Sequence, residues 1–162
     1  MRITVTIIHV IFGLLLVGAM GAYAAEAPNG FRSLQWGAAP SGGMRPVGPT
    51  KDELSIYVPA SGASLPPLFG IPVAEESYSF SKGKFYSGSA WLDGQENFEK
   101  MKASLTKAYG TPSFVNEKLY LWKWKWPGNR IEIDLLFQPK DTRTTVTFLN
   151  DAISGAVPPP SK

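Results

Sequence analysis

The most regular alternation of hydrophobic and polar residues runs from Lys118 to Phe137. In its first half aromatic residues alternate with leucine and lysine, and in its second half aliphatic residues alternate with charged ones. Alternation with a period of two is typical of a β-strand with one buried face. Pro127-Gly128-Asn129 separates the halves, and Gly128-Asn129 suits a two-residue turn with positive φ. The stretch therefore predicts one β-hairpin.

Two independent patterns predict the register of this hairpin. On one face tryptophans oppose aliphatic residues, in the pairs Trp126 with Ile131, Trp124 with Ile133 and Trp122 with Leu135. On the other face lysines oppose carboxylates, in the pairs Lys125 with Glu132 and Lys123 with Asp134. A shift by one residue would break both patterns at once. We therefore expect the tryptophans to face the core and the charged residues to face solvent.

The segment from Glu76 to Leu92 predicts a second hairpin, which turns at Lys82-Gly83. The expected pairs are Phe80 with Phe85 and Tyr78 with Ser87. The middle of its second strand has only small residues, Gly88, Ser89 and Ala90. Small residues let another element approach closely, and we expect a helix to pack there.

Apolar residues at helical spacing predict a helix from about Gln95 to Tyr109. Asp93 followed by Glu96 resembles a capping box with aspartate as the cap. Gly110 suits the left-handed residue that ends a helix. The apolar stripe of this helix is expected to belong to the core.

Weaker alternation predicts three more strands, at Phe31 to Trp36, Glu53 to Val58 and Thr142 to Leu149. The last of these follows a four-residue turn at Gln138 to Asp141. The pairs expected from that turn are Ile133 with Val146 and Ile131 with Phe148.

Two stretches are rich in glycine and proline. From Gly37 to Pro49 we expect no regular element. From Pro59 to Pro72 we expect a long loop, and loops of this length in a compact domain are often functional.

The order of elements, strands, then a helix, then three strands, predicts an α+β fold. We expect an antiparallel sheet of about five to six strands, made of two hairpins and a C-terminal strand, with one amphipathic helix packed on one face.

The first 24 residues predict a secretory signal peptide. Arg2 precedes an apolar run from Ile7 to Val17, and small residues end at Ala24, near which we expect cleavage. The remaining chain predicts a single α+β domain at 25–150 and a disordered, proline-rich tail at 151–162. We expect a periplasmic or secreted protein with no membrane span.

Composition excludes several kinds of catalytic site. The chain has no cysteine, and its one histidine, His9, lies inside the expected signal peptide. Serine–histidine triads, cysteine nucleophiles and ordinary zinc sites are therefore excluded from the mature protein. A formal net charge of +3 is too small to indicate a nucleic-acid partner. We expect no cofactor and no metal.

Several landmarks together resemble a known family. In chain order they are Phe31, Trp36-Gly37, Gly70-Ile71-Pro72, Tyr78-Ser79-Phe80, Gly83-Lys84-Phe85-Tyr86, Asn97-Phe98, Leu105, Tyr109-Gly110-Thr111-Pro112 and Trp122. The chain resembles a family of small exported proteins of unknown function from Gram-negative bacteria. The resemblance implies periplasmic export and a sheet with one helix, and it implies nothing about a substrate.

These observations favour a non-enzymatic binding or protein-interaction module of the cell envelope, whose partner is a protein or a glycan. In the loop from Pro59 to Pro72 the candidate contact residues are Leu65, Leu68 and Phe69. On the outer face of the sheet the candidates are Lys123, Lys125, Glu132, Asp134 and Arg143.

Two alternatives remain open. Glu132 and Asp134 share a strand face and could act as acid and base in a glycan hydrolase, although the opposing lysines favour the ionised carboxylates. The three tryptophans of the first hairpin could bind a membrane surface if they were exposed. In a strand, however, they point away from the lysines between them.

Overall fold

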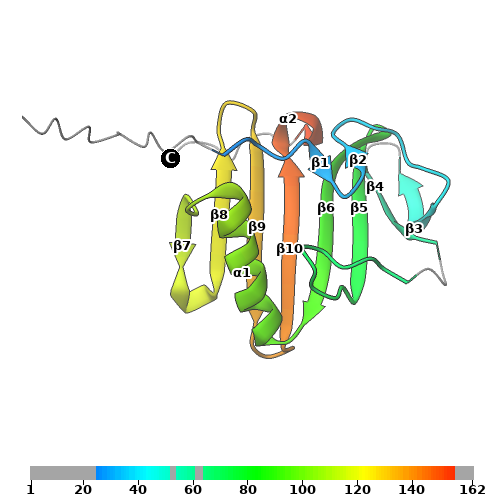
Figure 1. Cartoon of the computed structure of the whole chain (residues 1–162). Coiled ribbons are helices and arrows are strands. Elements are labelled where there is room, and N and C mark those ends of the chain that lie inside the picture. Colours follow the sequence, from blue (N-terminus) through cyan, green and yellow to red (C-terminus); the bar gives the residue numbers. More distant parts are fainter. Residues whose placement is uncertain (1–24, 52–53, 61–63, 156–162) are drawn as a thin grey trace, which may run out of the picture.

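The computed structural model describes residues 25–51, 54–60 and 64–155 (Figure 1). Its main element is an eight-stranded antiparallel sheet in the order β3-β4-β5-β6-β10-β9-β8-β7, and a separate two-stranded ladder joins β1 and β2. One long helix, α1, accompanies the sheet. The expected α+β class, antiparallel sheet and single long helix are confirmed, but the sheet has more strands than we expected.

In chain order the elements are β1 (Gly30–Phe31), β2 (Leu34–Gln35), β3 (Met44–Lys51), β4 (Leu54–Pro59), β5 (Glu75–Ser81), β6 (Lys84–Asp93), α1 (Gln95–Tyr109), β7 (Phe114–Asn116), the 3₁₀ turn η1 (Glu117–Leu119), β8 (Leu121–Trp126), β9 (Ile131–Gln138), β10 (Arg143–Asn150) and α2 (Asp151–Ser154).

Three expected segments fall wholly or partly outside the described residues. They are the signal peptide at 1–24, positions 61–63 of the long loop and positions 156–162 of the tail. Residues Asp151–Ser154, which we expected to begin that tail, instead form α2. The Asn150 side chain caps this helix by accepting a hydrogen bond from the backbone N–H of Ala152. In the described part of the chain, no helix is long and apolar enough to cross a membrane.

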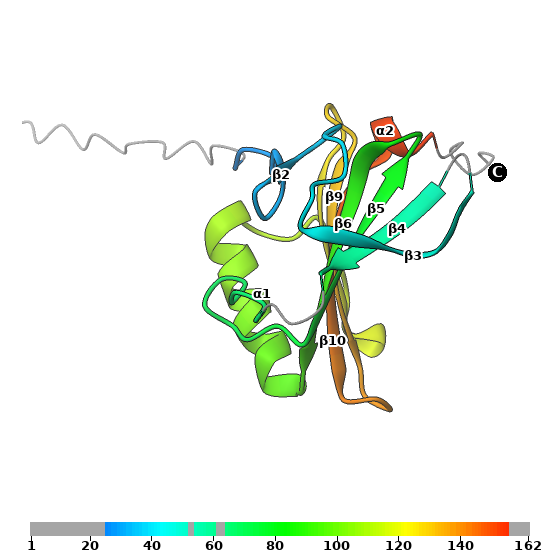
Figure 2. The ribbon, with the colours of Figure 1, turned by 90° about the vertical axis from the view of Figure 1, so that its right-hand side faces the viewer.

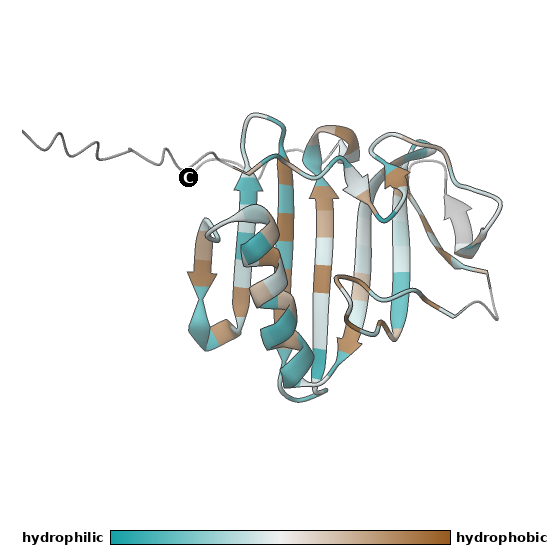
Figure 3. Cartoon of the chain, in the orientation of Figure 1, coloured by the Kyte–Doolittle hydropathy of each residue, from teal (hydrophilic) through white to brown (hydrophobic). Residues whose placement is uncertain are grey.

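The two faces of the sheet differ in what lies over them. Figure 2 shows α1 and β2 on the same side of the sheet. The helix packs on β6, β9 and β10 through Phe98, Met101 and Leu105, which are buried. We call this side the covered face and the opposite side the open face. Along β9 and β10 hydrophobic residues alternate with more polar ones, so the hydrophobic set points to the covered face (Figure 3).

The hairpin of β8 and β9 has the expected register. All five predicted pairs are present, from Trp126 with Ile131 to Trp122 with Leu135. Trp124 is 2% exposed, and its indole N–H donates to the carbonyl of Gly110. The turn is different, because four residues separate the strands and Arg130, rather than Gly128 or Asn129, has a positive φ of 54°.

One other expected register was wrong, and another was correct only in part. Residues 139–142 form the turn before β10, one position later than expected, and the pairing moves by two residues to Leu135 with Val146 and Ile133 with Phe148. A shift of two keeps every side chain on its face. In the other hairpin Phe80 pairs with Phe85 as expected, but a bulge then places Tyr78 opposite Gly88 rather than Ser87.

The helix has the expected bounds, and Gly110 follows it with the expected positive φ of 79°. Its start is different. Gly94 occupies the N-cap position with no side-chain cap, so the predicted capping box with Asp93 was wrong. The Asn97 amide donates instead to the Asp93 carbonyl at 2.8 Å.

The N-terminal part of the chain departs most from expectation. The segment we expected to be a single strand from Phe31 to Trp36 is the tight β1–β2 ladder. The edge strand β3 (Met44–Lys51) pairs with β4 and begins inside the stretch from Gly37 to Pro49, where we expected no regular element. Its proline and glycine content is tolerated because one side of an edge strand has no partner.

Candidate functional site

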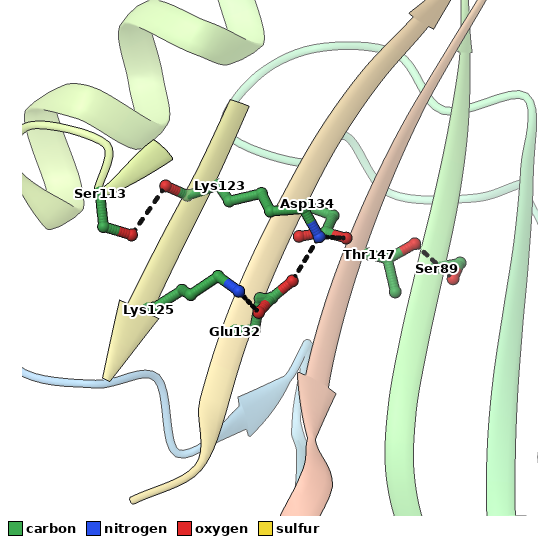
Figure 4. Close-up of polar contacts among 7 residues, drawn as sticks. All are labelled: Ser89, Ser113, Lys123, Lys125, Glu132, Asp134 and Thr147. Atoms are coloured by element: carbon green, nitrogen blue, oxygen red, sulfur yellow. Dashed lines mark hydrogen bonds and ion pairs between the residues drawn. The ribbon is translucent and has the colours of Figure 1, made fainter. Parts of the chain in front are cut away.

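Four charged side chains from β8 and β9 meet on the open face (Figure 4). Lys123 Nζ donates to Glu132 Oε1 at 2.6 Å and to Asp134 Oδ2 at 2.7 Å. Lys125 Nζ lies 2.7 Å from Glu132 Oε2. We call these four residues the open-face cluster. The structure therefore brings together, on the open face, four of the five residues that we predicted for the outer face of the sheet.

The cluster follows directly from the register of the hairpin. Lys123 pairs with Asp134 and Lys125 with Glu132, and a diagonal contact links Lys123 to Glu132 as well. Because it lies in the middle of the cluster, the Glu132 side chain is 15% exposed while that of Lys125 is 45% exposed. Partial burial strengthens these ion pairs relative to ordinary surface pairs.

The two carboxyl groups of the cluster have very different pKa values. Burial raises the pKa of Asp134 to about 6, and a hydrogen bond with Glu132 adds to this, while Lys123 opposes it. Burial would also raise the pKa of Glu132, but hydrogen bonds from Asp134 and from two lysines outweigh burial and lower it to about 2. Glu132 has two ammonium partners and Asp134 has one, which explains the direction of the split.

The shared lysine is held in its charged form. Burial lowers the pKa of Lys123, but hydrogen bonds to Asp134 and Glu132 outweigh burial, so the pKa lies above its ordinary value. Lys123 is therefore a cation that the two carboxyl groups share.

Asp134 has one atom for which the described residues provide no hydrogen-bond partner. Its Oδ1 is buried and has no hydrogen-bond donor among the described residues. Thr147, its neighbour on β10, is hydrogen-bonded to Ser89 on β6 at 3.0 Å, so these hydroxyls continue the polar row across the sheet. Buried polar atoms in folded proteins nearly always have a partner.

Arg143 lies on the same face but away from the cluster. It pairs with Glu75 at 2.8 Å, and its guanidinium lies 5.6 Å from the ring centre of Trp91. Its Nε is the second buried side-chain atom without a partner in the part of the chain that the structure describes. Arg143 lies on the same face as the two lysines, as we expected, but it contacts a different set of residues.

The loop candidates lie on the covered face instead. Leu68 is buried in the core, Leu65 is half-buried and Phe69 is 41% exposed. Arg32 holds this segment by donating to the carbonyls of Pro66 and Pro67 at 2.7 and 2.8 Å. The predicted contact residues therefore belong to two sites on opposite faces.

Sequence reasoning missed the group that fixes the loop. Arg32 forms a buried ion pair with Glu76, and Tyr78 donates to the other oxygen of Glu76 at 2.8 Å. Burial and the carboxylate raise the pKa of Tyr78. One signal was available in the sequence, because Glu76 shares a strand face with Tyr78 and Phe80 and is therefore a carboxylate on a core-facing position.

Among the described residues, no group of three or more acidic residues or histidines is placed to hold a metal ion. Comparisons with protein-family models, with curated proteins and with solved structures found no match.

Proposed function

We propose that the protein is a non-enzymatic, exported binding module of the cell envelope, and that its contact surface is the open face of the sheet. One observation carries the proposal. Both buried side-chain atoms without a partner in the described chain, Asp134 Oδ1 and Arg143 Nε, lie on this face. An unsatisfied buried acceptor and donor cost free energy, and a bound partner recovers it where the side chain turns toward that partner on binding.

The charge pattern of the open face favours a partner with both donors and acceptors. The open-face cluster has two cations and two anions, and Arg143 with Glu75 adds one more pair. Such a surface offers no positive patch for a phosphate backbone. A protein or a glycan of the cell envelope fits this pattern better than a nucleic acid.

Export rests on the signal-peptide pattern at residues 1–24. Cell fractionation followed by N-terminal sequencing tests it. We expect the protein in the periplasm or the medium with a mature N-terminus near Ala25, and an uncleaved chain in the cytoplasm would contradict export.

The contact surface is tested with matched amide variants. Asp134→Asn keeps the shape of the side chain but removes the charge of the unsatisfied carboxylate. Asp141→Asn makes the same change on an exposed turn residue. We expect Asp134→Asn to recover at least about tenfold less of the envelope components that co-purify with the wild-type protein, as for other buried charge-assisted contacts. We expect Asp141→Asn to recover as much of them as the wild type does. Equal recovery with both variants would contradict the open face as the contact surface.

A second candidate function is glycan hydrolysis by Glu132 and Asp134. The separation of their pKa values, about 2 and about 6, favours it because an acid–base pair needs one protonated and one ionised carboxyl group. The geometry is less favourable. Glycosidases keep their two carboxyl groups at least about 5 Å apart to accommodate the scissile bond, whereas here both carboxyl groups accept a hydrogen bond from the same ammonium group of Lys123.

Release of reducing ends from peptidoglycan or from neutral polysaccharides tests the hydrolase. Activity that is lost in both Glu132→Gln and Asp134→Asn but retained in Asp141→Asn would establish it, and the absence of activity from pH 4 to 8 supports the binding module.

A further inference from the structure

A cavity of about 630 Å³ lies on the covered face, on the opposite side of the sheet from the open-face cluster. One wall is the β1–β2 ladder, and another is the segment from Pro67 to Phe69. Tyr109 at the end of α1 and Phe148 on β10 also line it. Its volume lies within the range of about 300 to 1,000 Å³ that is usual for small-molecule sites.

Aromatic rings form a continuous wall of this cavity. The ring centres of Phe31 and Phe148 are 5.3 Å apart, those of Phe148 and Tyr109 are 6.5 Å apart, and those of Tyr109 and Phe69 are 6.4 Å apart. The last two pairs meet edge to face. A further aromatic ring can join such a wall in a tilted or edge-on contact.

Further contacts of the lining residues hold the wall in place. Phe31 packs directly on Gly88, where a side chain would not fit beside the ring. Arg32 fixes the segment of Pro66 and Pro67 through their carbonyls, and Glu76 holds Arg32. The cavity therefore exists before a ligand binds, which lowers the cost of ordering on binding.

Phe69 stands out within this wall. It has a positive φ of 51° and is followed by Gly70, which also has a positive φ. Reciprocal backbone hydrogen bonds of 2.9 Å between Leu68 and Ile71 hold this turn. An aromatic residue in the left-handed region costs free energy, and residues of this kind concentrate at ligand sites.

The polar groups of the cavity are neutral or already paired. Arg32 is the one charged residue among those that line it, and its guanidinium is engaged by Glu76 and by two carbonyls. Burial raises the pKa of Tyr109, which keeps this residue neutral. The Tyr109 hydroxyl has no hydrogen-bond partner among the described residues, so it is available to a ligand.

We propose that this cavity binds a neutral small molecule that contains an aromatic ring and one hydrogen-bonding group. The ring of the ligand packs on the aromatic wall, and its polar group forms a hydrogen bond with the Tyr109 hydroxyl. The absence of an unpaired charge among the lining residues disfavours ions. This site is separate from the open face, so it does not depend on the function proposed above.

A pair of fluorescent probes tests the charge preference. N-phenyl-1-naphthylamine has an aromatic body and one N–H group, and 1-anilinonaphthalene-8-sulfonate is the same molecule with an added anionic sulfonate. We expect the neutral probe to bind the purified protein in a saturable manner with one site, and the sulfonate to bind at least about tenfold more weakly, because its charge would be buried without a partner.

Variants place the bound probe in the cavity. Ser33→Phe adds a ring to an exposed residue that lines the cavity, and Ser41→Phe makes the same change at an exposed serine elsewhere. We expect Ser33→Phe to weaken binding of the neutral probe at least about tenfold by filling the space, and Ser41→Phe to leave it unchanged. Tyr109→Phe keeps the ring and should weaken binding by about two- to tenfold, the effect of one lost hydrogen bond.

Circular dichroism and thermal melting establish that each variant is folded. If Ser33→Phe does not fold, Asn29→Phe replaces it, because Asn29 is also exposed and also lines the cavity. The proposal is overturned if the neutral probe does not bind, if the sulfonate binds equally well, or if the filling variant binds like its control.

Discussion

The ring of Phe31 occupies the space that a side chain at Gly88 would need. A Cβ atom added to Gly88 would lie 2.3 Å from Phe31 Cδ1, and Phe31 itself is 1% exposed. The contact joins β1, near the start of the described chain, to the middle of β6. The small residues of β6 therefore receive the N-terminal segment at this point, where we had expected the helix.

Gly88→Ala should lower the free energy of unfolding, because the added methyl group must displace the Phe31 ring. Overpacking of this kind costs about 1 to 3 kcal/mol. Chemical denaturation measures the loss. Gly42→Ala is the matched control, since a Cβ there would meet nothing within 4 Å. An equal effect of the two substitutions would contradict the close contact.

Arg32→Met should loosen the segment from Ser64 to Ile71 and destabilise the fold. The substitution leaves Glu76, which is 4% exposed, without its cation, and breaking a buried ion pair costs about 3 to 5 kcal/mol. Hydrogen–deuterium exchange should show faster exchange at Leu68 and Ile71, whose amides bond to each other's carbonyls. Arg45→Met, at an exposed arginine, should change neither the exchange nor the stability.

The contribution of Asp134 to stability should fall as the pH rises from about 4 to about 6. In this window the folded protein keeps the proton, because its pKa is about 6, while the unfolded chain has lost it. The free energy of unfolding, measured at pH 4, 5, 6 and 7, should therefore fall more with rising pH for the wild type than for Asp134→Asn. A difference between the two proteins that is constant across this range would contradict the raised pKa.

Glu132 should have the opposite effect at lower pH. Its folded pKa of about 2 lies below the unfolded value, so its contribution to stability is complete above about pH 4.5 and is lost as the pH falls toward 2. The difference in free energy of unfolding between the wild type and Glu132→Gln should therefore shrink as the pH falls from about 4.5 toward 2. Denaturation at pH 2, 3, 4 and 5 measures the loss, and a constant advantage across that series would contradict the lowered pKa.

The register of β8 and β9 could be predicted from the sequence because two patterns restrict it. Trp124 must meet an apolar residue while Lys125 meets a carboxylate, and these requirements agree in one alignment. The end of α1 was also predictable, because Gly110 suits the residue that follows a helix.

The register of β10 was not predictable to the same degree. Val146 finds an apolar partner in Ile133 or in Leu135, and a shift of two residues leaves the faces unchanged. No opposed charges in this strand pair distinguish the two alignments. The bulge that moves Tyr78 to Gly88 likewise leaves no signal in an alternating sequence.

Contacts between segments far apart in sequence were the hardest to predict. The cavity combines Phe31, Phe69, Tyr109 and Phe148, and no local pattern brings these four together. The sheet has more strands than we expected because the edge strands β3 and β7 have no clear alternation in the sequence. The split of the carboxyl pKa values also escaped the sequence, because the register assigned one lysine to each carboxylate whereas Lys123 binds both.

Site-specific photo-crosslinking in living cells tests the central claim most directly, namely that the open face contacts a partner. A photoreactive phenylalanine derivative at Thr145, half-buried on the open face, is compared with the same group at Ala103, exposed on α1. We expect a discrete adduct from Thr145 and none from Ala103. An adduct from Ala103 alone, or none from Thr145, would contradict the assignment of the open face as the contact surface.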